Sequence, residues 1–155
     1  MDNNKMNKKD LESFYIKYGI FCSIMYCIPI LVIFANSLFM NFWLLYLGNA
    51  LFFCLLIFVV IYVNHSLGGS GGFRTLCIAG FKITSVSILT SCILIFLMLT
   101  AFRGSIQQLP NIPFSDKNNG MSNILFFNAI FVNLPGGALG SLVGAMSAKQ
   151  HLKIG

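Results

Sequence analysis

The fold is decided by residues 42–63, which read FWLLYLGNALFFCLLIFVVIYV and contain no Asp, Glu, Lys or Arg. A bilayer core about 30 Å thick is crossed by roughly 20 helical residues, because each residue adds about 1.5 Å along the axis. The stretch also lacks the alternation of apolar and polar residues that is typical of a membrane β-strand. It therefore predicts a transmembrane helix.

The composition of the whole chain agrees with this prediction. Of its 155 residues, 57% are apolar and 9% are charged, against about 45–50% and about 25% in soluble domains. So few charges cannot cover a water-facing surface, which excludes a disordered chain, a nucleic-acid-binding tail and an ordinary soluble enzyme. We expect one membrane domain covering residues 1–155.

Three more apolar stretches have the length of a membrane span. The predicted spans are residues 19–39, 42–63, 76–102 and 123–148, with an N-terminal arm at 1–18 and an outer loop at 103–121. The expected fold class is therefore all-α, an integral membrane bundle of four transmembrane helices. Pro29 and Pro135 fall inside spans and predict kinks. Asparagines and glycines make the fourth span the least apolar, so its first half could instead lie at the interface.

The basic residues predict the orientation of the bundle. Eight of them lie outside the spans or near a span end on one side: Lys5, Lys8, Lys9, Lys17, Arg74, Lys82, Lys149 and Lys153. Only Arg103 and Lys117 lie on the other side. Because Lys and Arg collect on the cytoplasmic side, both termini are expected in the cytoplasm. The net charge of +6 then follows from topology and predicts contact with membrane lipids rather than nucleic acid.

The spans lack the residues on which membrane catalysis usually depends. They contain no Asp or Glu, whereas proton-coupled transporters and intramembrane hydrolases usually need a buried carboxylate or an activated nucleophile. The cysteines are not spaced as C-x-x-C and have no His or carboxylate near them in sequence; they are Cys22, Cys27, Cys54, Cys77 and Cys92. The sequence therefore predicts no enzyme, no catalytic residue, no metal site and no cofactor.

A stripe of small residues in the fourth span is the most specific packing signal. Gly136, Gly140, Gly144 and Ala148 recur every four residues and so share one helix face. Such a stripe lets another helix approach closely. The expected counterpart is a small face on the third span that includes Gly80 and Thr84. The interface could lie within the chain, between two copies, or with a partner.

Two further sets of polar residues are candidate sites. Arg74 and Lys82 lie beside the glycine-rich link 68–72 and could hold a lipid phosphate at the cytoplasmic face. Asn128 and Asn133 are costly in lipid, so they should face other helices or line a polar path through the bundle. The long outer loop 103–121 is the expected docking element on the opposite side.

Short glycine-centred motifs resemble a bacterial inner-membrane family of four-helix proteins known as domain of unknown function 4199. The matching pieces are Leu67-Gly68-Gly69, Gly72-Phe73, Gly80-Phe81-Lys82-Ile83-Thr84, Leu134-Pro135-Gly136 and Ser141-Leu142-Val143. Lys17-Tyr18-Gly19 looks like the family's usual opening. The resemblance implies the same topology and a multi-pass protein of the bacterial inner membrane. It implies no activity.

Two functional hypotheses follow from these patterns. The first is a non-enzymatic structural or assembly subunit that packs through its small-residue helix face, with itself or with a larger membrane complex. The alternative is a small transporter or channel for a neutral or lipid-like substrate, with a path beside Pro135. A lipid-modifying enzyme would need a nucleophile, base or metal set that the sequence does not contain in a recognisable arrangement.

Overall fold

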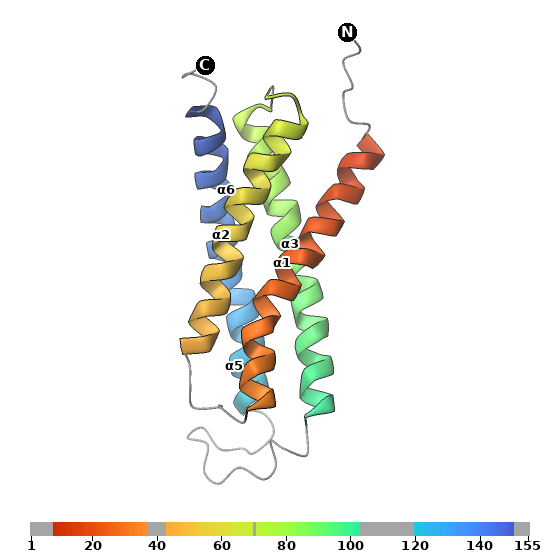
Figure 1. Ribbon diagram of the computed structural model, residues 1–155, viewed down its shortest axis with the longest axis vertical. Coiled ribbons are helices and arrows are strands. Elements are labelled where there is room, and N and C mark those ends of the chain that lie inside the picture. The colour runs from red at the N-terminus through yellow and green to blue at the C-terminus, as the bar shows by residue number, and fades with distance from the viewer. Residues whose placement is uncertain (1–7, 37–42, 70, 103–119, 151–155) are drawn as a thin grey trace.

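A computed structural model describes residues 8–36, 43–69, 71–102 and 120–150 (Figure 1). Its elements are α1 (Lys8–Ala35), α2 (Trp43–Ser66), α3 (Phe73–Ala101), α5 (Gly120–Phe127), the π-helical turn η1 (Asn128–Val132) and α6 (Asn133–Gln150). Every regular element in these ranges is a helix, which confirms the all-α part of the predicted fold class. Most of the outer loop predicted at 103–121 lies outside the described residues, as do Lys5, Arg103, Lys117 and Lys153.

Four helices are long and apolar enough to cross a membrane. They cover Asp10–Ala35, Trp43–Ser66, Phe73–Ala101 and Ser122–Ala148, the last combining α5, η1 and α6. These ranges overlap the four spans predicted from the sequence. The main difference is at the start of the chain, where α1 begins at Lys8 inside the stretch assigned to an N-terminal arm.

The early start of α1 has a packing reason. Tyr15 is buried, while Leu11, Phe14 and Tyr18 are partly buried and pack against the core. Their spacing of three and four residues places them on one helix face. That face continues the buried face of the first predicted span, so the helix extends beyond the span toward the N-terminus. Figure 1 shows this first part of α1 leaning away from the other helices.

The four long helices form a bundle in which α2 and α3 each contact both α1 and α6. The starts of α1 and α3 and the ends of α2 and α6 lie at one end (Figure 1); we call it the 67–72 end. The largest fully buried side chains include Tyr26, Phe34, Phe52, Leu56 and Ile83. The outward faces are apolar as well, with Phe58, Leu89 and Leu139 exposed. Helices that are apolar all round suit a hydrocarbon environment.

The turn after α2 depends on two glycines with left-handed backbone conformation. Gly68 and Gly69 have φ of 65° and 75°. The Gly69 N–H donates to the Asn64 carbonyl at 2.9 Å, which satisfies a carbonyl at the end of α2. Such a conformation costs an L-residue with a side chain about 1–2 kcal/mol.

We therefore predict that Gly68→Ala lowers the free energy of unfolding by about 1–2 kcal/mol. A Cβ at position 68 would meet nothing within 4 Å, so the loss is conformational. Gly72→Ala is the matched control, because Gly72 has φ −63° and a Cβ there would meet only Thr75 Oγ1, at 3.7 Å. Thermal unfolding in detergent measures both variants. Equal shifts would contradict the role assigned to the positive φ.

Both prolines predicted to lie within spans are inside helices, and Pro135 follows an irregular turn. Pro135 lacks an N–H, which leaves the carbonyl four residues earlier without its usual donor. The structure places the π-helical turn η1 directly before this point, so the irregularity predicted at Pro135 takes the form of a widened turn. Pro29 lies inside α1, and α1 changes direction in its middle (Figure 1).

Candidate functional site

The small-residue stripe on α6 packs against α2 inside the chain. A Cβ on Gly144 would lie 2.9 Å from Val60 Cβ and 3.2 Å from the Ile57 carbonyl, and one on Gly140 would lie 3.2 Å from Leu56. Ala148 is buried, and its carbonyl accepts a hydrogen bond from Asn64 Nδ2 at 3.4 Å. These residues thus bring α2 and α6 close together.

An adjacent row of small residues brings α6 against α3. A Cβ on Gly137 would collide with Thr84, and one on Gly80 would collide with Ser141. The face expected on the third span as the counterpart of the stripe therefore packs against this adjacent row, whereas the stripe itself packs against α2. Gly136 differs from the rest of the stripe, because a Cβ there would meet nothing within 4 Å. Its outward position leaves it free of tight helix contacts.

A cluster of polar side chains joins three parts of the chain inside the bundle. We call Tyr26, Asn49, Asn128 and Asn133 the polar centre. Asn49 and Asn128 exchange amide hydrogen bonds of 3.0 and 3.2 Å, and Asn128 Nδ2 donates to the Tyr26 hydroxyl at 2.7 Å. Asn133 is buried near the same hydroxyl. The two asparagines predicted as a path thus lie at either end of η1, facing other helices.

Further polar groups are buried between the helices. Ser23 on α1 and Ser91 on α3 share a hydrogen bond of 3.0 Å, and Cys27 lies beside them. Within the described residues, Ser87 Oγ and Asn64 Oδ1 are buried without a hydrogen-bond partner. None of the side chains in the polar centre carries a charge, so this region can hold helices together or contact a neutral polar group.

Arg74 and Lys82 are both exposed on α3. Eight residues separate them, or about 12 Å along the helix axis. Lys82 Nζ lies 5.4 Å from the centre of the Tyr15 ring, a cation–π distance that ties it to α1. Arg74 lies in the first turn of α3. The two residues therefore lie at different depths of the bundle.

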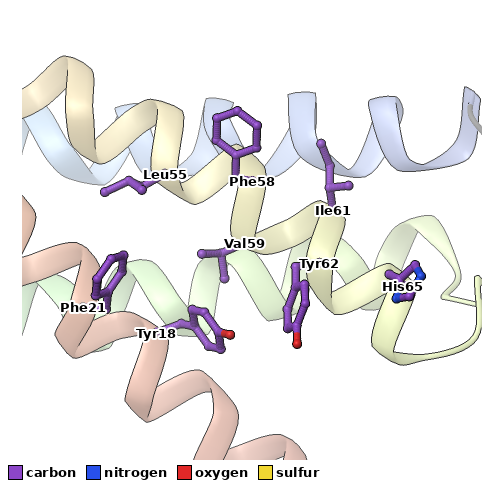
Figure 2. A pocket seen from close by; sticks show the side chains of 8 residues that line it. All are labelled: Tyr18, Phe21, Leu55, Phe58, Val59, Ile61, Tyr62 and His65. Atoms are coloured by element: carbon purple, nitrogen blue, oxygen red, sulfur yellow. The ribbon is translucent and has the colours of Figure 1, made fainter.

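A lateral groove between α1 and α2 was not anticipated from the sequence. It has a volume of about 510 Å³ and is open on one side (Figure 2). Its lining residues are Tyr18, Phe21, Leu55, Phe58, Val59, Ile61, Tyr62 and His65. Almost all of the lining surface is apolar. Because it is lined by Tyr18 in the first half of α1 and by His65 near the end of α2, the groove lies toward the 67–72 end.

The cysteines are all free, and Cys22 and Cys27 are buried. No group of three or more His, Cys, Asp or Glu residues that could hold a metal ion occurs in the part of the chain that the structure describes.

Sequence reasoning did not single out Tyr26 or the groove. A tyrosine in the middle of an apolar span was an available signal for the first, because a buried phenol usually has a hydrogen-bond partner. Tyr18 and Tyr62 carried a weaker signal as aromatic residues near a span boundary.

Comparison with known proteins adds no relative, since no family model, curated protein or solved structure matches the chain.

Proposed function

We propose that this chain is a non-enzymatic, multi-pass membrane protein that acts as a structural or assembly subunit. The single observation that carries the proposal is the polar centre, where Asn128 bonds to both Asn49 and Tyr26. Polar groups buried in this way fasten helices together and contain no acid, base or nucleophile of recognisable catalytic geometry.

The proposal includes insertion in the bacterial inner membrane with both termini in the cytoplasm. Support comes from the four apolar helices and from the excess of Lys and Arg on one side of the spans. The resemblance to domain of unknown function 4199 remains a prediction. Since the stripe on α6 is occupied by α2, a protein partner would contact outward faces such as the one containing Leu139 and Met146.

Crosslinking in native membranes tests the assembly role. We expect the protein to stay in the membrane fraction after alkaline extraction and to form one discrete crosslinked species larger than the monomer. Mass spectrometry of that species identifies a second copy or another membrane protein. A chain recovered only as a monomer, over a range of crosslinker lengths, would contradict the assembly role while leaving the membrane assignment intact.

The π-helical turn η1 favours a second candidate, a small transporter or channel for a neutral or lipid-like substrate. Such turns occur frequently at functional sites, and this one places Asn128 and Asn133 beside Tyr26. A flux assay in liposomes distinguishes the candidates, because a transporter should lose flux in Asn133→Leu while the folded bundle persists.

A further inference from the structure

The groove between α1 and α2 has polar groups at one end only. Figure 2 shows Tyr18 and Tyr62 near each other, with His65 at the end closest to the 67–72 link. The remaining lining, from Leu55 and Phe21 onward, is hydrocarbon. This distribution matches an amphiphile that lies parallel to the helices with its polar head at the 67–72 end.

We infer that the groove binds one acyl chain of an anionic phospholipid, with the headgroup beside Lys17 and His65. The inference rests on the membrane insertion proposed above and is independent of the assembly role. It assigns the groove a lipid ligand rather than a protein partner.

The length of the groove favours a lipid over another helix. Along α2 it extends from Leu55 to His65, ten residues or about 15 Å. The hydrocarbon core of a bilayer is about 30 Å thick, so this distance equals one leaflet. An acyl chain has that length, whereas a transmembrane helix would extend well beyond the groove. The volume of about 510 Å³ is also within the range of about 300–1,000 Å³ found for small-molecule sites.

The charge near the polar end favours an anionic headgroup. Lys17 is exposed and precedes Phe21 by four residues, so it lies on the groove side of α1, one turn closer to the helix start. Asp10 shares that side but lies about 10 Å farther along the axis, which makes Lys17 the nearer charge. The imidazole of His65 adds a hydrogen-bond donor on α2.

Three aromatic rings hold the polar end together. Phe14 and Tyr62 stack at 5.7 Å, while Tyr18 and Tyr62 lie 5.8 Å apart. These contacts link α1 to α2 where α1 leans outward. They also place the Tyr18 and Tyr62 rings together at the polar end of the groove, and tyrosine is typical of the membrane–water interface.

Quenching of a tryptophan by brominated lipids tests the inference. Trp43 is the only tryptophan in the chain, so Trp43→Phe gives a background in which Phe58→Trp reports on the groove. Leu142→Trp is the matched control, because it is exposed on α6 and, like Phe58, lies eight residues before its helix ends at the 67–72 end. Each protein is placed in vesicles of phosphatidylcholine containing a small fraction of brominated phosphatidylglycerol or brominated phosphatidylcholine.

We expect brominated phosphatidylglycerol to be enriched about fivefold at position 58, since one basic group near an anionic headgroup has an effect of this size. At position 142 the two brominated lipids should quench more nearly alike. Adding Lys17→Gln and His65→Gln should remove the difference in quenching between the two brominated lipids at position 58. Quenching at position 142 should not change.

Other outcomes overturn the inference in distinguishable ways. Equal quenching by both lipids at 58 would mean that the groove has no preference for an anionic lipid, and a preference that survives Lys17→Gln and His65→Gln would place its origin elsewhere. Quenching at 58 that is weaker than at 142 in both lipids would mean that protein covers the groove. No quenching at either position would overturn membrane insertion itself.

Discussion

Replacing Gly144 by leucine is expected to lower the free energy of unfolding by about 3 kcal/mol, the upper end of the usual cost of overpacking. A Cβ at this position would lie 2.9 Å from Val60 Cβ and 3.2 Å from the Ile57 carbonyl. Backbone of α2 cannot retreat as a flexible side chain can, so α2 and α6 must separate. For a chain of this size the thermal midpoint should fall by roughly 6–12 °C.

Gly136→Leu is the matched control for this prediction. It places the same side chain on the same helix, where a Cβ would meet nothing within 4 Å. Thermal unfolding in detergent and size-exclusion chromatography should show Gly136→Leu unchanged. If Gly144→Leu were as stable as the parent protein, the packing of α6 against α2 would be wrong. A changed oligomeric state in Gly136→Leu alone would indicate that position 136 contacts another subunit.

This pair of variants also illustrates what the sequence could predict. The spacing of Gly140 and Gly144 indicated a face that another helix approaches closely, and the structure has such a close approach. The spacing contained no information on which helix approaches, because a small-residue stripe has the same pattern within one chain and between two. The apolar run alone does not give the start of α1 for a related reason, since the limits of an apolar run do not mark the limits of a helix that packs by one face.

The polar centre was predictable only in part. Asn128 and Asn133 were expected to face other helices because an unpaired amide is costly in hydrocarbon. Their pairing with Tyr26 depends on how α1 crosses the bundle and on the widened turn at η1, which no local pattern determines. The groove depends in the same way on the inclination of the first part of α1. Long-range geometry of this kind cannot be predicted from the periodicity and composition of the sequence.

Asn128→Leu is expected to cost about 1–3 kcal/mol for a buried group left without a partner. The change removes the donor to the Tyr26 hydroxyl and both hydrogen bonds with Asn49. Tyr26→Phe should cost less, because Asn128 keeps its exchange with Asn49. Asn123→Leu is the control, since Asn123 is exposed on α5 and its replacement should cause no loss of stability.

A double-mutant cycle separates a closed network from a polar path. If Asn49 and Asn128 act mainly on each other, Asn49→Leu combined with Asn128→Leu should cost less than the sum of the single changes, by about 0.5–3 kcal/mol. Thermal unfolding of the four proteins in detergent gives this coupling energy. Additive effects would contradict the network. Additive effects together with a loss of liposome flux would favour the transporter, because amides that line a path act on the substrate rather than on each other.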